Sequence, residues 1–375
     1  MKFCANCFND EEIKAIINGN NNRMEGTVCP NCSANDVVLY DTEERFELRD
    51  ILEDFFDNYC VHDTGNNIAY ELTEVWNIFN LSLSRETILE IIKAICEDYF
   101  DEHSALLNNK IILKQKLNSE FLSSECILSG TTWEEFQCEL KEVNRYHSKA
   151  INLDIFKTLL SYVESVYQCQ NTTFYRARIS KNGNLLTRND MGAPPSDISG
   201  DGRINARGVT CLYLATDEDT CIHEVRAGAF DLVTIGKFKI KRPIRLVDLS
   251  RIDKISPFKN NLNIDIAKLA INKEFLHNLD NTLRKPLSSS DNTLEYIATQ
   301  YISDYIKSIR DNQSQEPMYD GIEYSSTHSS IGKNIALFAV KDEICKCECI
   351  DVKTIKINGL RYEPEVQCDW CIAPQ

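Results

Sequence analysis

The sequence predicts an α+β protein in which a small zinc ribbon and a mostly α-helical region precede a mixed β core with helices. Three observations predict this fold class. Two Cys-x-x-Cys pairs lie near the start, apolar residues then recur at helical spacing, and strand-like segments separated by turns follow from about residue 170. A chain of 375 residues is long enough for two or three cores. We expect domains over 1–35, 36–165 and 166–345, and a cysteine-rich tail over 346–375.

Composition is that of an ordinary globular protein, with 43% hydrophobic and 26% charged residues. The formal net charge of −16 argues against broad non-specific binding to nucleic acid or anionic membranes. The polar, cysteine-bearing start is unlike a signal peptide, and no run of about 18 apolar residues predicts a membrane span. We therefore expect a cytoplasmic protein whose 16 cysteines are reduced and whose paired cysteines bind metal.

The N-terminal cysteines form two knuckles, Cys4/Cys7 and Cys29/Cys32, with 21 residues between them. Four thiolates at this spacing suit one tetrahedral Zn²⁺, and a short segment without another core needs such a metal to fold. We expect structural zinc here; free thiols in a tail are the alternative. A ribbon of this kind binds nucleic acid or protein, or only caps a domain.

Segments 43–60 and 85–100 have the apolar spacing of amphipathic helices, and "TTWEEF" begins a further helix capped by threonine with Glu135 behind it. Strands are expected at 172–180 and 208–216, as a pair at 232–240 and 243–250, and last at 335–340. Helices are expected at 262–280 and 293–310. Aromatic residues of the helical region are expected in its core: Phe55, Phe56, Tyr59 and Trp133. Cysteines of the tail either form a second metal site or pack on the domain: Cys345, Cys347, Cys349, Cys368 and Cys371.

Residues 176–207 contain six basic and three acidic residues, so this segment of an acidic chain has a net charge of +3. Guanidinium groups bind phosphate oxygens two at a time, so the segment suits a pyrophosphate, although any single loop arginine is as well explained by solvation. "GDGRIN" lacks the third glycine of a dinucleotide loop and precedes its strand. The basic residues are Arg176, Arg178, Lys181, Arg188, Arg203 and Arg207.

A helix is expected after the strand at 208–216, capped by Thr216 with Asp219 three positions on. Cys221, Ile222 and Val225 define its apolar face, and Glu224 falls on the border of that face. A half-desolvated carboxylate there can stabilise positive charge; a surface glutamate is the alternative.

Four separated motifs now support a resemblance. "FYRARIS", "GRINARGVTCLYLATDEDTCIHEVR", "YIATQYISDYI" and "YDGIEYSSTHSSIGKNIALF" closely resemble the RES domain, a family named for its Arg, Glu and Ser residues, over about residues 170–342. The resemblance implies a fold similar to ADP-ribosyltransferases and an activity that degrades NAD⁺. In bacteria such proteins are typically toxins of toxin–antitoxin pairs.

The resemblance also implies roles for single residues. Arg176 and Arg203 match the arginines that meet the NAD⁺ phosphates or ribose, and Tyr213 matches the aromatic residue near nicotinamide. Glu224 matches the glutamate, either Ser326 or its neighbour Ser325 the serine, and Asn334 a recurrent polar position. Ala177 stands where some family members have a tyrosine, and Arg207 has no assigned role.

The segment before residue 170 resembles the extension of long RES proteins, described as related to helical ribonucleases. No Arg-x4–6-His pair of those ribonucleases occurs in it, which argues against a nuclease role.

The resemblance implies an NAD⁺ glycohydrolase with NAD⁺ as substrate and water as acceptor, and it alone implies the role of a toxin or defence effector. The cysteine spacing adds Zn²⁺ as a structural ion. Phosphate as acceptor, ADP-ribosyl transfer to a macromolecule, and a non-catalytic nucleotide or nucleic-acid binding protein are the alternatives. An antitoxin or other protein partner, nucleic acid at the N-terminal region and a homo-oligomer stay open as partners, and no membrane partner is expected.

Overall fold

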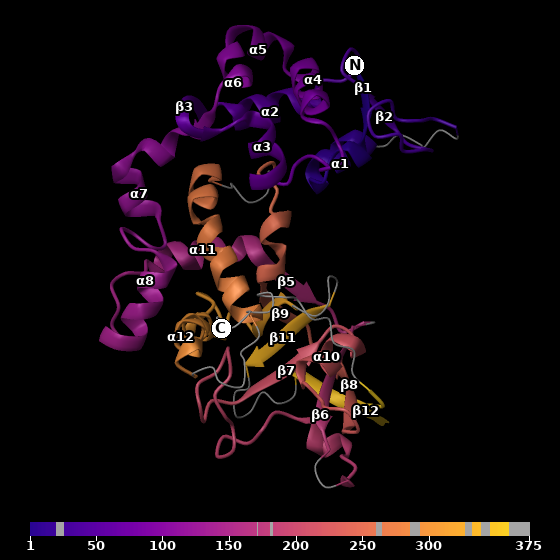
Figure 1. Cartoon of the computed structure of the whole chain (residues 1–375), viewed down its shortest axis with the longest axis vertical. Coiled ribbons are helices and arrows are strands. Elements are labelled where there is room, and N and C mark those ends of the chain that lie inside the picture. Colours follow the sequence, from indigo (N-terminus) through magenta and orange to yellow (C-terminus); the bar gives the residue numbers. More distant parts are fainter. Residues whose placement is uncertain are drawn as a thin grey trace, which may run out of the picture. The chain divides into compact units, whose positions relative to one another are not determined.

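A computed structural model describes most of the chain and divides it into two compact units (Figure 1). The described residues are 1–19, 26–170, 172–180, 183–259, 265–285, 293–326, 332–338 and 346–359. Unit 1 comprises Met1–Glu164, Val247–Leu283 and Asn292–Tyr301, and unit 2 comprises Ser165–Leu246, Arg284–Asp291 and Ile302–Gln375. Among the described residues, none of the helices has the length and apolarity needed to cross a bilayer.

Unit 1 is mostly helical, as the apolar spacing predicted. The predicted helix over 43–60 is shorter than expected, because α2 spans Glu47–Phe56 and β3 (Tyr59–Asn66) follows. Capping at Thr132 is confirmed: its side chain accepts from the backbone N–H of Glu135, whose carboxylate accepts from the backbone of Thr132. The predicted core aromatics Phe55, Phe56, Tyr59 and Trp133 are all buried.

The remaining elements of unit 1 are mostly short. At its start, β1 pairs antiparallel with β2, which closes the segment that carries the four cysteines. These elements are β1 (Lys2–Cys4), η1 (Ala5–Cys7), α1 (Glu11–Asn18), β2 (Leu39–Asp41), α3 (Ile68–Tyr70), η2 (Glu71–Val75), α4 (Arg85–Ile95), α5 (Glu97–Glu102), α6 (Ser104–Asn108), β4 (Ile111–Leu113), η3 (Lys114–Leu117), α7 (Ser119–Glu125), α8 (Trp133–Cys138), η4 (Glu139–Val143), α9 (Leu153–Leu160), η5 (Ser161–Val163), η8 (Leu249–Lys254), α11 (Ile266–Arg284) and η10 (Thr293–Tyr296).

Unit 2 is built on an eight-stranded sheet of order β12-β8-β6-β7-β11-β10-β9-β5, so the α+β class is confirmed. The strands are β5 (Glu164–Tyr167), β6 (Thr173–Ile179), β7 (Cys211–Ala215), β8 (Leu232–Ile240), β9 (Ile244–Asp248), β10 (Gly321–Ser325), β11 (Lys333–Phe338) and β12 (Cys347–Lys356). Helix α10 (Glu218–Glu224) and the short η7 (Arg188–Met191) also belong to unit 2, and α12 (Ile297–Ser308) crosses from unit 1 into unit 2 after Tyr301.

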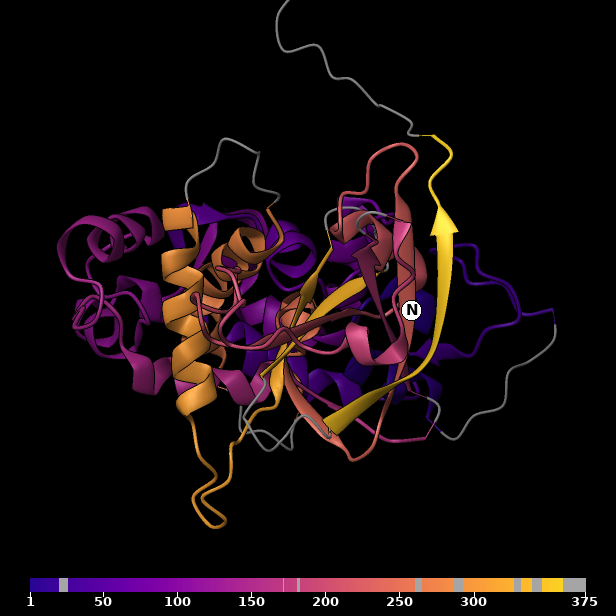
Figure 2. The same cartoon turned by 90° about the horizontal axis from the view of Figure 1, so that it is seen from below.

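Two sequence predictions about the strands were wrong. β8 and β9 are both strands but do not pair, because β6 and β12 already occupy the two edges of β8 and β9 lies next to β10 and β5. The segment 335–340 is not the last strand, because β12 follows it and adds to β8 as an edge strand, visible in yellow in Figure 2.

The sheet carries an apolar cluster on each face. Phe174, Leu212 and Phe238 belong to one cluster, and Ala177 and Ala215 belong to the other, against which the apolar side of α10 packs. The strands β6 and β7 pair at a single position, Tyr175 with Ala215, whereas β6 pairs with β8 along its whole length. β7 therefore diverges from β6 on either side of that one pair.

Candidate functional site

The helix that carries Glu224 starts one residue later than predicted. Asp217, not Thr216, caps α10: its carboxylate accepts from the backbone N–H and the hydroxyl of Thr220, both at 2.8 Å. Thr216 remains tied to the sheet, because its backbone N–H donates to the carbonyl of Lys333 on β11 at 3.0 Å. The helix ends at Glu224, since Arg226 adopts a left-handed conformation with φ 51°.

Glu224 is exposed and its carboxylate is held by a residue far along the chain. Its Oε1 accepts a hydrogen bond from Nδ2 of Asn334 at 2.7 Å. Asn334 is buried on β11, where it pairs with Ala215 of β7. The fold thus joins two of the predicted site residues that are 110 positions apart.

Tyr213 fixes the glycine-rich loop that carries Arg203. Its hydroxyl donates to Oδ1 of Asn205 at 2.7 Å and accepts from the backbone N–H of Ile204 at 3.3 Å. A Cβ on Gly202 would lie 2.5 Å from both the Tyr213 oxygen and Oδ1 of Asn205, so the loop requires glycine there. The buried Asn205 was not predicted from the sequence, although an asparagine inside a glycine-rich loop is itself a sign of side-chain hydrogen bonding to backbone.

The two loop arginines differ in exposure. Arg203 is half-buried beside Gly202, whereas the Arg207 side chain is exposed. The backbone N–H of Arg207 donates to the carboxylate of Asp201 at 2.9 Å, which closes the loop.

Arg176 lies on β6 and is half-buried. Its Nη1 atom is buried and has no hydrogen-bond partner within the part of the chain that the structure describes. Burial, and next the charge of Arg178, lower the pKa of the guanidinium to about 10, while Cys211 and Tyr213 on β7 act in the opposite direction. The group is therefore still charged at neutral pH and lies within electrostatic reach of Tyr213.

The candidate serines lie where β10 meets β11. Ser325 pairs with Lys333, one position from the pair between Tyr324 and Asn334. Ser326 is buried, and its backbone N–H donates to the carbonyl of Gly332 at 3.3 Å. Both serines are thus near Asn334 along the strand pair, and the geometry does not choose between them.

Strand β10 also carries a buried carboxylate that was not predicted from the sequence. Glu323 is fully buried, accepts a hydrogen bond from the hydroxyl of Tyr167 at 2.8 Å and forms an ion pair with Nζ of Lys333 at 3.0 Å. The available signal was a carboxylate between Ile322 and Tyr324 in a short strand.

The four N-terminal cysteines lie together, as their spacing predicted. Their sulfur atoms all lie within 4.8 Å of one another, with Cys4 to Cys32 at 3.5 Å and Cys7 to Cys29 at 3.6 Å. Zn–S bonds of about 2.3 Å in a tetrahedron place sulfur atoms about 3.8 Å apart, so the donor set fits zinc. Burial raises the pKa of the Cys4 thiol to about 12, so a bound ion would have to displace its proton.

The predicted second cysteine site is only partly described. Cys347 and Cys349 lie on β12, and the part of the chain described here brings no third metal-binding residue to them. Cys345, Cys368 and Cys371 lie outside the described residues.

Comparison with protein-family models identifies a domain in this chain. Residues 173–355 match the family model described as the RES domain, which confirms the resemblance seen in the motifs. This family is associated with NAD⁺-related activity. Comparison with curated proteins found no match. Comparison with solved structures found none either.

Proposed function

We propose that the RES-domain region of this chain, residues 173–355, hydrolyses NAD⁺ at the bond between nicotinamide and ribose. The observation that carries the proposal is the contact between Glu224 and Asn334. A carboxylate that is exposed to ligand yet oriented by a buried amide can stand beside a developing positive charge without first reorganising.

The chemistry requires little beyond such a carboxylate. As the C–N bond breaks, its electron pair leaves with nicotinamide and positive charge grows on the ribose, as in other glycosidic cleavages. Glu224 stabilises that charge and orients a water whose oxygen bonds to the anomeric carbon. The water's second proton is released, so the products are ADP-ribose, nicotinamide and H⁺.

Arg176 supports NAD⁺ as the substrate. Keeping a guanidinium buried with an unpartnered Nη1 costs free energy unless a ligand supplies the missing acceptor. A diphosphate supplies several charged acceptors, and we assign Arg176 and Arg203 to it. Tyr213 would then present its ring to nicotinamide, because its hydroxyl is already engaged by the loop.

The test is incubation of the pure full-length chain with NAD⁺ alone, followed by chromatography of the products. We expect equal amounts of nicotinamide and ADP-ribose. ADP-ribose 1″-phosphate formed only with added phosphate would identify a phosphorylase instead. NAD⁺ that stays intact at high protein concentration would contradict the enzyme and favour a nucleotide-binding protein.

ADP-ribosyl transfer to a macromolecule is the second candidate function. The observation that favours it is the exposure of Glu224, which leaves room for a large acceptor beside the carboxylate. Label from NAD⁺ carried onto an added cell extract would support transfer, and label recovered only as free ADP-ribose would exclude it.

We also propose the role of a toxin or defence effector with an antitoxin or other protein partner, which the RES resemblance supports. Strong growth inhibition on expression, relieved in the Glu224→Gln variant, is its test.

A further inference from the structure

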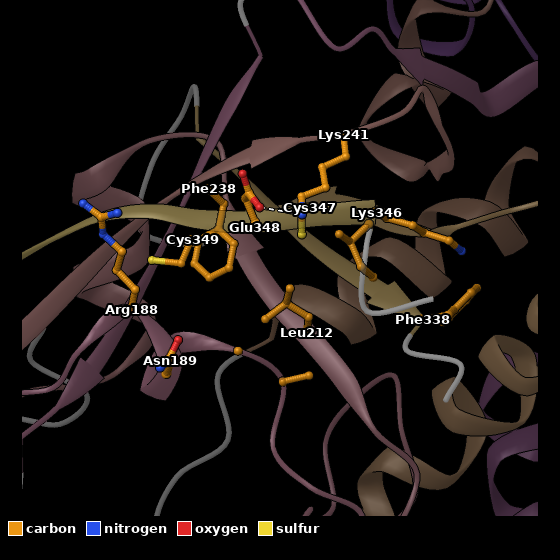
Figure 3. A pocket seen from close by; sticks show the side chains of 13 residues that line it. Arg188, Asn189, Leu212, Phe238, Lys241, Phe338, Lys346, Cys347, Glu348 and Cys349 are labelled. Carbon is orange, nitrogen blue, oxygen red and sulfur yellow. Dashed lines mark ion pairs between the residues drawn. The ribbon is translucent and has the colours of Figure 1, made fainter. Parts of the chain in front are cut away.

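Unit 2 contains a pocket that none of the assigned site residues lines. Its volume is about 260 Å³, and η7, β7, β8, β11 and β12 all contribute to its wall (Figure 3). Pockets that take drug-sized ligands span about 300–1,000 Å³. This pocket is therefore too small for a dinucleotide and suits a compound of one or two rings.

The floor of the pocket is apolar. Leu212, Phe238 and Leu337 line it and belong to one buried cluster of the sheet, and Phe338 lies at one end. The Cys347 thiol is also in the wall, and burial raises its pKa to about 12, so it contributes an uncharged sulfur.

The rim carries one cation without a counter-charge among the described residues. Nζ of Lys241 pairs with Glu348 at 2.5 Å, and Nζ of Lys346 pairs with Asp320 at 2.7 Å, so both lysines are neutralised. The Arg188 guanidinium, at the end of the pocket opposite Lys346, forms no ion pair or hydrogen bond with any residue of the described ranges.

The pocket lies across the sheet from the loop that Tyr213 holds. Leu212 pairs with Leu337 and Tyr213 pairs with Ala336 on the same two strands. Successive side chains of a strand point to opposite faces, so the two leucines face the pocket while Tyr213 faces away from it. A ligand here would therefore leave the face that carries Tyr213 and Asn334 accessible.

We propose that this pocket is a second ligand site, which takes a small molecule with a flat apolar body and a single anionic group. The apolar body lies on Leu212, Phe238 and Leu337, and the anion meets Arg188. Burial of the ligand's apolar surface against the pocket floor provides affinity. The Arg188 guanidinium selects carboxylates or sulfonates over uncharged compounds of the same shape.

Calorimetry on the full-length chain tests the proposal with two matched probes, 2-naphthoate and uncharged 2-naphthylmethanol. We expect 2-naphthoate to bind about tenfold more tightly, the preference of a charge-assisted hydrogen bond. The Arg188→Gln variant should bind both probes equally. Arg310→Gln, which changes an exposed guanidinium elsewhere in unit 2, should retain the preference.

A second variant checks the location without relying on charge. Ala193 lines the pocket and is half-buried, so Ala193→Leu should fill it and abolish binding of both probes while far-UV circular dichroism is unchanged. Equal affinity of the two probes for the unmodified chain, or 2-naphthoate binding that survives Ala193→Leu, would overturn the proposal. Neither result depends on NAD⁺ hydrolysis, so the two proposals fail separately.

Discussion

Lys273 in unit 1 is buried and Arg176 in unit 2 is half-buried with a buried Nη1, and the two cations differ in the partners that the fold gives them. Nζ of Lys273 donates to the carbonyl of Val75 at 2.7 Å, pairs with Asp253 at 3.4 Å and lies 5.8 Å from the Trp76 ring. Nη1 of Arg176 has no hydrogen-bond partner among the described residues. Burial lowers the pKa of both groups. Among the described residues, Lys273 has a hydrogen-bond acceptor and a counter-charge, whereas Nη1 of Arg176 has no acceptor. A buried charge that the fold satisfies is structural, and one that it leaves unsatisfied points to a ligand.

The largest expected effect is the loss of zinc from unit 1 without loss of the activity proposed for unit 2. Cys7→Ser removes one of four zinc ligands, and a structural Zn²⁺ contributes on the order of 10 kcal/mol to the segment that binds it. We expect the zinc content, measured by mass spectrometry, to fall from one ion per chain to none, and the first 35 or so residues to become protease-sensitive. Nicotinamide release should persist.

Its matched control is Cys60→Ser, which changes a half-buried cysteine outside the cluster and should retain one zinc. Loss of NAD⁺ cleavage together with zinc would show that unit 1 does more than support its own fold.

Glu224→Gln should be next in size. An amide of similar shape cannot stabilise the charge on ribose, so kcat for nicotinamide release should fall by about 10²–10³-fold. The unfolding midpoint should stay within a degree or so, because Glu224 is exposed. Glu218→Gln, on the same helix and paired with Lys353 at the surface, is the control and should keep normal turnover. A normal rate in Glu224→Gln would remove this residue from the mechanism.

Matched methionine substitutions test the two cations directly. Lys273→Met should destabilise the chain by about 1–3 kcal/mol, because the Val75 carbonyl loses its donor. Arg176→Met should leave the thermal midpoint unchanged or raise it, since it removes a buried charge that lacks a partner, and should raise KM for NAD⁺ about tenfold. A lower midpoint in Arg176→Met would mean that the fold itself depends on that charge.

The smallest effect concerns the counter-charge of Lys273. The hydrogen bond from His277, then the charge of His277 and then that of Lys273, hold the pKa of Asp253 below its usual value against the opposing effect of burial. A depressed carboxyl pKa stabilises the fold above the unfolded-state pKa of about 3.9, and that contribution is lost as pH falls through the folded-state value. Because the Asp253 side chain is 59% exposed, Asp253→Asn should cost under about 1 kcal/mol at pH 6. The difference in urea midpoint should shrink towards pH 3, and a constant difference would exclude the carboxylate as its source.

The sequence predicted best those features that are formed by residues close together along the chain. Each knuckle of the cysteine cluster is a Cys-x-x-Cys pair within four residues, so the spacing alone indicated the metal site. The helix cap at Thr132 is likewise encoded within four residues. Motifs indicated Glu224 and Asn334 separately, but their 2.7 Å contact depends on strand order, which spacing does not encode.

The errors have the same cause. Thr216 and Asp217 are both good caps, and the bond from Thr216 to β11, which a single sequence does not reveal, leaves Asp217 to start the helix. β8 and β9 are neighbours in sequence and were paired for that reason, whereas the late strand β12 occupies the edge that β9 would need. Glu323 was missed because its partners Tyr167 and Lys333 come from distant strands.

The distance along the chain between Glu224 and Asn334 has a consequence for biosynthesis. Translation at about 5–20 residues per second separates the two residues by roughly 5–20 s, and β11 must then leave the ribosome before it can insert beside β7. During that interval Glu224 has been made, but the amide that orients it has not. A nascent chain that ends before β11 therefore lacks the Glu224–Asn334 contact on which the proposed reaction depends.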